Sequence, residues 1–251
     1  MVWRTWGRGP ALVLLHGGYG SWAHWIRNIQ PLARDFRVIV PDMPGFGHSA
    51  DPPEPYSAES IATILSRGLD AIVDAGAAVY VAGFSFGGVI AGHLAAQQGR
   101  RVSRLVLVGA GGLGARRGEM PDLVVRSPDM TAAEIENAHR RNLEILMLAD
   151  PRAVDALALH IQAHNTRLHR VKSRPISATD TLARVLAAVS ADLGAIWGAR
   201  DATAGRYLDQ REQILCAVKP DLDFRVVLDA GHWVMYEAPE LFVAQLRAMV
   251  Q

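Results

Sequence analysis

The sequence predicts an α/β fold in which a mostly parallel central sheet is flanked by helices. Short runs that are almost wholly apolar recur along the chain, and helical patterns separate them. Runs without polar alternation are typical of strands buried on both faces, and strand–helix alternation favours a parallel sheet. One long stretch without a convincing strand predicts a helical insertion between two strands of this sheet.

The core domain is predicted from residues 1–112 and 191–251. Its strands are expected at Ala11–Leu15, Phe36–Val40, Ala78–Ala82, Arg104–Val108, Leu193–Trp197 and Phe224–Leu228. Its helices are expected at Trp25–Ala33, Ala58–Ala75, Gly87–Gln98, Arg206–Val218 and Pro239–Met249. A chain of 251 residues buries enough apolar surface for such a core without a disulfide, and the single cysteine permits none.

The insertion is predicted over residues 113–190, with helices at 131–148, 150–171 and 181–189. Thr131 and Glu134 have the spacing of a capping box, and Asp150-Pro151 is typical of an N-cap and first helical residue. Because open α/β sheets bind ligands at the carboxyl ends of their strands, we interpret the insertion as a lid over that edge. A helical layer packed elsewhere is the alternative.

A nucleophile is predicted at Ser85, in the segment Gly83-Phe84-Ser85-Phe86-Gly87. This G-x-S-x-G pattern follows an apolar strand and precedes a helix, as a nucleophile elbow requires. A tight strand-to-helix turn needs small residues two positions to either side of the serine, and the two glycines meet that need. The alternative is a glycine-rich turn with an incidental serine.

An oxyanion hole is predicted from the backbone N–H groups of Gly18 and Phe86. Gly18 belongs to the glycine-rich loop that follows the first core strand, and Phe86 follows the nucleophile. Acyl transfer needs two such donors around the developing oxyanion. His16, at the start of the loop, is interpreted as a loop brace rather than a catalyst. The loop lacks the lysine pattern of a phosphate-binding loop, so phosphate binding is not expected.

The base is predicted to be His232 and the acid Asp201. A serine hydroxyl needs an adjacent base, and the base needs a carboxylate that sets its tautomer. Each of these residues comes just after a predicted strand and therefore falls at the carboxyl edge of the sheet. Asp229, the competing acid, shares a short loop with His232 and is poorly placed to reach around it. Asp42 is interpreted as a structural loop brace.

With these segments in view, the chain resembles the α/β-hydrolase superfamily across nearly its whole length. The matching segments are 15–18, 41–49, 83–88, 197–201 and 230–233. The resemblance implies that Ser85, Asp201 and His232 form a triad, that Gly18 and Phe86 form the hole, and that the insertion is a four-helix lid. Members of this superfamily usually carry one more strand before residues 2–6. Here that strand is missing or very short, so the sequence does not define one edge of the sheet.

The resemblance also limits the chemistry. Haloalkane dehalogenases and related epoxide hydrolases use an aspartate nucleophile, so a serine argues against both. We expect a serine hydrolase that acts through an acyl-enzyme on a small carboxylic ester or lactone. One alternative is hydrolysis of a carbon–carbon bond in meta-cleavage-type diketone acids, although Tyr236 stands near the place of a tryptophan typical of those enzymes. Acyl transfer, and a slow or non-catalytic ligand receptor on the same fold, are further alternatives.

Substrate-binding residues are predicted at Arg167 and Arg174, and at Trp233 beside the base. The stretch 160–174 carries arginines and a lysine but no acidic residue. An arginine fork binds both oxygens of a carboxylate, which suggests a substrate with an anionic group. The alternative is a solvated basic face. His160 and His164 share a helical face with Arg167, but without a neighbouring carboxylate motif no metal is expected.

Composition sets the remaining expectations. The net charge of +1 predicts no nucleic-acid partner, and the apolar runs are too short for a membrane span. The N-terminal residues show no signal-peptide pattern, so the expected location is the cytoplasm. We expect no cofactor and a small-molecule substrate, and a homo-oligomer is compatible with the sequence.

Overall fold

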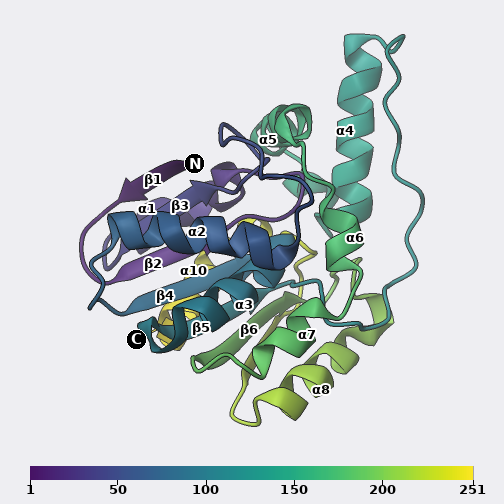
Figure 1. Cartoon of the computed structure of the whole chain (residues 1–251). Coiled ribbons are helices and arrows are strands. Elements are labelled where there is room, and N and C mark those ends of the chain that lie inside the picture. Colours follow the sequence, from purple (N-terminus) through teal and green to yellow (C-terminus); the bar gives the residue numbers. More distant parts are fainter. Residues whose placement is uncertain (251) are drawn as a thin grey trace.

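The computed structural model describes residues 1–250 and contains a seven-stranded sheet in the order β1-β3-β2-β4-β5-β6-β7 (Figure 1). The strands are β1 Val2–Trp6, β2 Ala11–Leu15, β3 Arg37–Asp42, β4 Val79–Phe84, β5 Val102–Val108, β6 Asp192–Gly198 and β7 Asp223–Val227. Strands β2 to β7 are parallel, and β1 is antiparallel to β3. The predicted α/β fold is therefore confirmed, and Val2–Trp6 forms the antiparallel edge.

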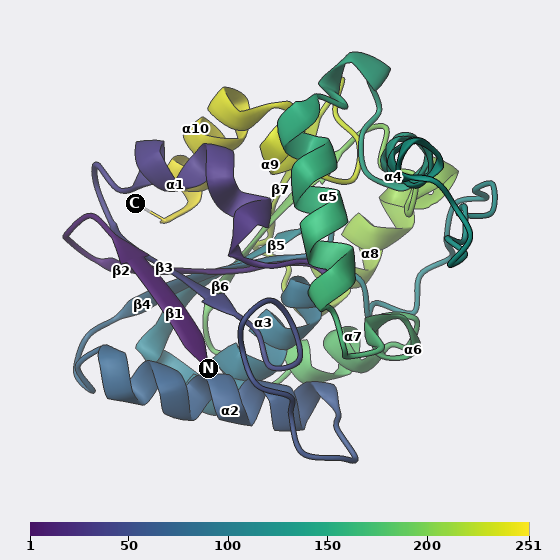
Figure 2. The same cartoon turned by 90° about the horizontal axis from the view of Figure 1, so that it is seen from above.

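Helices cover both faces of the sheet (Figure 2). The core helices are α1 Ile26–Leu32, α2 Ala58–Ile72, α3 Phe86–Gln98, α8 Leu208–Val218, α9 Val234–Glu237 and α10 Pro239–Val250. Buried residues of α2, α3 and α8 belong to one hydrophobic cluster, and those of α1, α9 and α10 belong to the other. The sheet thus separates two apolar cores.

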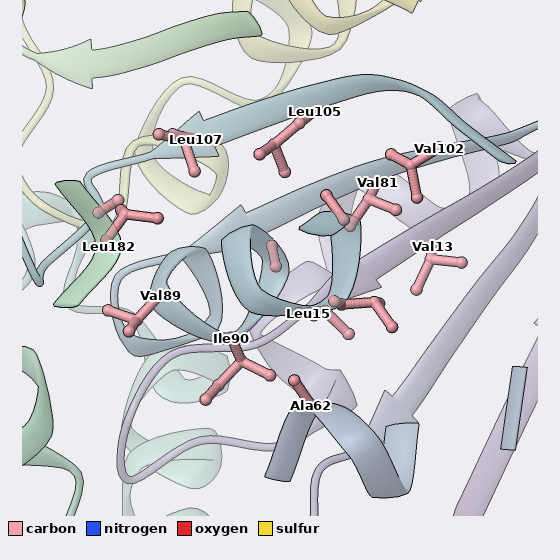
Figure 3. Packing of buried hydrophobic residues seen from close by; sticks show 14 of the residues in the cluster. Val13, Leu15, Ala62, Val81, Val89, Ile90, Val102, Leu105, Leu107 and Leu182 are labelled. Carbon is pink, nitrogen blue, oxygen red and sulfur yellow. The ribbon is translucent and has the colours of Figure 1, made fainter. Parts of the chain in front are cut away.

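Alternate residues of one strand enter different cores. In β2, Val13 and Leu15 face the helices α2 and α3, whereas Leu12 and Leu14 face α1 and α10. Figure 3 shows side chains of the first cluster, among them Val13 and Leu15 of β2 and Ile90 of α3. Burial on both faces explains why the strands lack polar alternation.

The insertion between β5 and β6 contains α4 Ala132–Leu146, α5 Ala156–Leu168, α6 Ser173–Ser177 and α7 Thr181–Leu186. The capping box of Thr131 and Glu134 opens α4 as expected. The helix predicted from Asp150 is wrong at its start. Asp150 caps only a short 3-10 turn, and α5 begins after Asp155, whose side chain accepts a hydrogen bond from the Ala158 N–H. Helix α6 was not located from the sequence pattern, but it completes the four helices that the resemblance implies.

Helix α7 differs in position from the rest of the insertion, because it packs against α3. Leu182 of α7 fills the space beside Gly92, where a Cβ would overlap its side chain. Leu182 and Leu186 belong to the same hydrophobic cluster as α2 and α3. The division into a core and an insertion at residues 113 and 190 stays a prediction, and residue 251 lies outside the described residues.

Candidate active site

Ser85 lies on the turn between β4 and α3. Its backbone has φ 53° and ψ −114°, a left-handed conformation that a non-glycine residue rarely adopts. The Ser85 N–H donates a 2.8 Å hydrogen bond to the Val108 carbonyl, which ties the turn to β5. The strained turn leaves the side chain half-buried at the carboxyl edge of the sheet.

The two glycines of the motif are explained by what surrounds them. A Cβ on Gly83 would collide with the Gly87 carbonyl oxygen, and a Cβ on Gly87 would collide with the Leu15 and His16 carbonyl oxygens. Backbone atoms cannot yield as a flexible side chain can. The spacing predicted from the sequence therefore corresponds to close backbone packing of the elbow against β2.

His232 and Asp201 converge on Ser85 from two other loops. The imidazole Nε2 lies 3.0 Å from the Ser85 Oγ, and Nδ1 lies 2.8 Å from the Asp201 Oδ2. Ser85 follows β4, Asp201 follows β6 and His232 follows β7, so the three residues meet at the carboxyl edge of the parallel part of the sheet. Such a line of hydrogen bonds allows the imidazole to take the serine proton while the carboxylate stabilises the resulting imidazolium.

Asp201 is held in its charged form by its surroundings. The carboxyl is buried, which alone would raise its pKa, but His232 and hydrogen bonds from Thr203 outweigh burial and lower the pKa below its ordinary value. Thr203 donates to Oδ1 from its N–H at 2.8 Å and from its hydroxyl at 2.7 Å. The other carboxylate oxygen is thereby left for the imidazole.

The loop 16–20 presents Gly18 beside the nucleophile. Gly18 and Phe86 line the same cavity as Ser85 and His232. Within residues 1–250 neither backbone N–H donates a hydrogen bond to another residue. Both groups are therefore free to bind an oxygen of a ligand.

Two buried histidines support this loop. His16 donates from Nδ1 to the Gly17 carbonyl at 2.8 Å and accepts at Nε2 from the Met43 N–H at 3.0 Å. His24 accepts at Nδ1 from the Gly17 N–H at 3.2 Å, so its own proton is on Nε2. Burial lowers the pKa of His16 to about 4 and that of His24 well below 6.5. The sequence reasoning missed His24, which a search for polar residues just after the glycine loop could have found.

A further residue missed from the sequence is Glu237, in the last turn of α9. Its carboxylate accepts hydrogen bonds from the backbone N–H groups of Gly231, Ala149 and Asp150 at 2.7, 3.1 and 2.7 Å. It therefore joins the loop that carries His232 to the insertion. In the sequence, the feature that could have pointed to Glu237 is its position six residues after Gly231.

A cavity of about 670 Å³ opens above Ser85, within the usual size of small-molecule sites. Arg117, Arg126 and Arg174 line it, together with Asp122. In the described part of the chain, Arg117 and Arg174 form no ion pair with a carboxylate. Desolvation and the charge of Arg174 lower the pKa of Arg117 and outweigh the opposing charge of Asp201.

Two of the predicted substrate-binding residues do not line the cavity. Arg167 is exposed near the end of α5, and its neighbour Thr166 faces the cavity instead. Trp233 is 1% exposed and its indole N–H donates to the His24 carbonyl at 2.9 Å. Trp233 therefore supports the core beneath the site, and only Arg174 of the three reaches the cavity.

The wall opposite the sheet comes from the insertion. The loop between β5 and α4 runs beside α4 in Figure 1, and Val124 exchanges two backbone hydrogen bonds with the Asn142 side chain, at 2.7 and 3.0 Å. Met120, Leu123 and Val124 of this loop line the cavity. The cavity thus combines an apolar wall with the arginines described above.

Within residues 1–250 no group of three or more His, Cys, Asp or Glu side chains is arranged to hold a metal ion. In the same range, no helix combines the length and apolar character needed to cross a membrane.

Comparison with known proteins places this site in context. A sequence model described as the alpha/beta hydrolase family matches residues 12–245. The pimeloyl-[acyl-carrier protein] methyl ester esterase of Vibrio campbellii is 33% identical over 155 residues, which cover 60% of this chain and 58% of that protein. The chain therefore spans less than two thirds of that esterase.

Two further similarities extend over most of the chain. The 2-hydroxy-6-oxo-6-phenylhexa-2,4-dienoate hydrolase of Burkholderia cepacia is 29% identical over 253 residues, covering 94% of this chain and 86% of that protein. The solved structure of the esterase RhEst1 from Rhodococcus sp. ECU1013 superimposes with a TM-score of 0.76 at 22% identity, over 98% of this chain and 92% of that one. At that identity the structural likeness supports the fold alone.

Proposed function

This chain belongs to the α/β-hydrolase family and is an esterase-like hydrolase, and we propose that it cleaves a small carboxylic ester or lactone through an acyl-enzyme on Ser85. The observation that carries the proposal is the hydrogen-bonded line from the Ser85 hydroxyl through His232 to Asp201. The intact triad argues against the alternative of a receptor without catalytic activity.

The proposed cycle uses this line twice. His232 takes the Ser85 proton while Oγ attacks the substrate carbonyl carbon, and the N–H groups of Gly18 and Phe86 stabilise the oxyanion. His232 then gives its proton to the departing alcohol as the carbon–oxygen bond breaks. A water molecule repeats the attack on the acyl-enzyme, with His232 again as base, and releases the acid and the free serine.

We also propose that the substrate carries an anionic group on the part of the molecule that lies away from the ester. Arg117 and Arg174 line the cavity without carboxylate partners among residues 1–250. A guanidinium binds a carboxylate through charge-assisted, bidentate hydrogen bonds. The apolar wall formed by Met120, Leu123 and Val124 suits the chain between the two ends of such a substrate.

Hydrolysis of a carbon–carbon bond is the second candidate. It is favoured by the Burkholderia cepacia dienoate hydrolase, whose similarity covers 94% of this chain, and the same arginines suit a diketone acid. Tyr236 offers no support for this candidate. It is buried, and its hydroxyl donates to Asp155 at 2.6 Å rather than lining the cavity.

Matched substrates test the proposal. We expect hydrolysis of 4-nitrophenyl esters that differ only in a terminal carboxylate or methyl group on the acyl chain. Loss of one charge-assisted hydrogen bond lowers binding roughly 10- to 100-fold, so Arg174→Ala is expected to reduce kcat/KM for the acidic ester by that factor. For the methyl-terminated ester the change is expected to stay within about twofold.

Arg167→Ala is the matched control, because Arg167 is exposed and away from the cavity. This variant is expected to leave kcat/KM for both esters unchanged. An equal loss of kcat/KM on both esters in Arg174→Ala would contradict the proposal of an anionic substrate. Full activity of Ser85→Ala would contradict the proposal of an acyl-enzyme on Ser85. A ring-cleavage dienoate in the same panel, turned over faster than either ester, would favour the second candidate.

A further inference from the structure

Ser173 places a hydroxyl of the insertion inside the active-site cavity. It is the first residue of α6, its side chain is 5% exposed, and it lines the cavity with Ser85. Among residues 1–250 its hydroxyl has no hydrogen-bond partner. The preceding residue, Lys172, donates from its backbone N–H to the Tyr56 hydroxyl at 3.0 Å. Because Ser173 lines the cavity and its hydroxyl is unpaired among these residues, the hydroxyl is available to a bound molecule.

The hydroxyl lies against the oxyanion loop. A Cβ on Gly18 would overlap the Ser173 Oγ and would lie 3.1 Å from the Ser173 Cβ and 3.8 Å from the Phe86 Cβ. The φ angle of Gly18 is outside the left-handed region, so its backbone would accept an alanine. A larger residue at this position would therefore be opposed by the Ser173 side chain and not by its own backbone conformation.

The position of Ser173 is set by its neighbours on both sides. Val171 is buried and packs beside Gly45, where a Cβ would overlap its side chain. The hydrogen bond from Lys172 to Tyr56 fixes the next residue to the core. The start of α6 is thus anchored to the core next to Gly18. Such anchoring holds the Ser173 hydroxyl in a fixed position, which a hydrogen-bonding group in an active site requires.

We propose that the Ser173 hydroxyl is a third donor to the carbonyl oxygen of the substrate, supplied by the insertion beside the backbone donors Gly18 and Phe86. The inference rests on the proposed acyl-enzyme function. Because the oxygen gains negative charge as Ser85 attacks, the hydrogen bond strengthens towards the transition state. Ser173 is then a catalytic residue whose loss lowers kcat more than it raises KM.

Serine variants test the role with a neutral 4-nitrophenyl ester. Ser173→Ala is expected to lower kcat about 10- to 100-fold with KM within about threefold, since single oxyanion donors have effects of this order or larger. Ser173→Thr keeps the hydroxyl and is expected to retain most of the rate. Ser190→Ala, at an exposed serine of the insertion that does not line the cavity, is the matched control and is expected to stay within twofold. The inhibition constant of a trifluoromethyl ketone should rise in Ser173→Ala in proportion to the loss of kcat/KM.

A second pair of variants tests the contact itself. Gly18→Ala is expected to reduce activity strongly in the wild-type background and only slightly in a Ser173→Gly background, where the overlapping atoms are gone. Equal losses in both backgrounds, or at least half of the wild-type kcat in Ser173→Ala, would overturn the proposal. Ser85→Ala distinguishes failure of this inference from failure of the proposed function. If Ser85→Ala is inactive and Ser173→Ala is fully active, only this inference fails. If Ser85→Ala is active, the proposed function fails.

Discussion

Acidification is expected to destabilise the protein through His16, the first residue of the oxyanion loop 16–20. His16 is fully buried, and its Nε2 accepts the Met43 N–H while its Nδ1 donates to the Gly17 carbonyl. Protonation of Nε2 would abolish the bond from Met43 and bury a charge. Burial therefore lowers the pKa of His16 from 6.5 to about 4.

The magnitude follows from these two pKa values. Because the folded state favours the neutral ring, the stabilisation from His16 is complete above pH 6.5 and is lost as the pH falls towards 4. A difference of about 2.5 pKa units at about 1.36 kcal/mol per unit amounts to about 3.4 kcal/mol in total. Between pH 7 and pH 4.5 the same linkage gives a loss of about 2.4 kcal/mol.

Urea unfolding at both pH values, compared with His16→Gln, isolates this contribution. The glutamine carbonyl oxygen can accept the Met43 N–H in place of Nε2 and does not titrate. We expect the wild type to lose about 2.4 kcal/mol more of its free energy of unfolding than the variant does over this interval. An equal loss in the two proteins would refute the assignment of a neutral, buried His16.

Three other changes have defined outcomes. Gly87→Ala forces a Cβ into backbone carbonyl oxygens, so thermal unfolding should reveal a loss of about 1–3 kcal/mol with little remaining activity; an unchanged Tm would contradict the packing described for the elbow. Glu237→Gln replaces a carboxylate that accepts three backbone N–H groups, and urea unfolding should show a loss of about 1–3 kcal/mol, together with a lower kcat because Gly231 is less firmly held. A variant with wild-type stability and rate would show that this anchor is dispensable. Thr203→Val removes a hydroxyl that helps to lower the pKa of Asp201, so the acid limb of kcat/KM should move to higher pH, and an unmoved limb would exclude this role.

The sheet and the elbow could be predicted because their signals are local. Strands buried on both faces are continuous apolar runs, and the tight turn at Ser85 needs glycines two residues away on each side. The capping box at Thr131 was equally local. The start of α5 was misplaced because Asp150 and Asp155 are both competent caps, and only the fold determines which one begins the longer helix.

The substrate-facing residues could not be predicted in the same way. Arg117 and Ser173 reach the cavity from two ends of the insertion, and no motif joins residues 56 positions apart. Arg167 and Arg174 looked equivalent in the sequence, yet the break between α5 and α6 turns only Arg174 to the cavity. Trp233 was predicted to bind substrate, but its side chain is buried and stacks on Tyr236.

Covalent labelling with a fluorophosphonate tests most directly whether Ser85 is a nucleophile activated by His232. Intact-mass and peptide analysis are expected to find one adduct, on the peptide that contains Ser85, and His232→Asn is expected to slow its formation at least about a thousandfold. An adduct on another residue, or labelling of His232→Asn at the wild-type rate, would contradict the account.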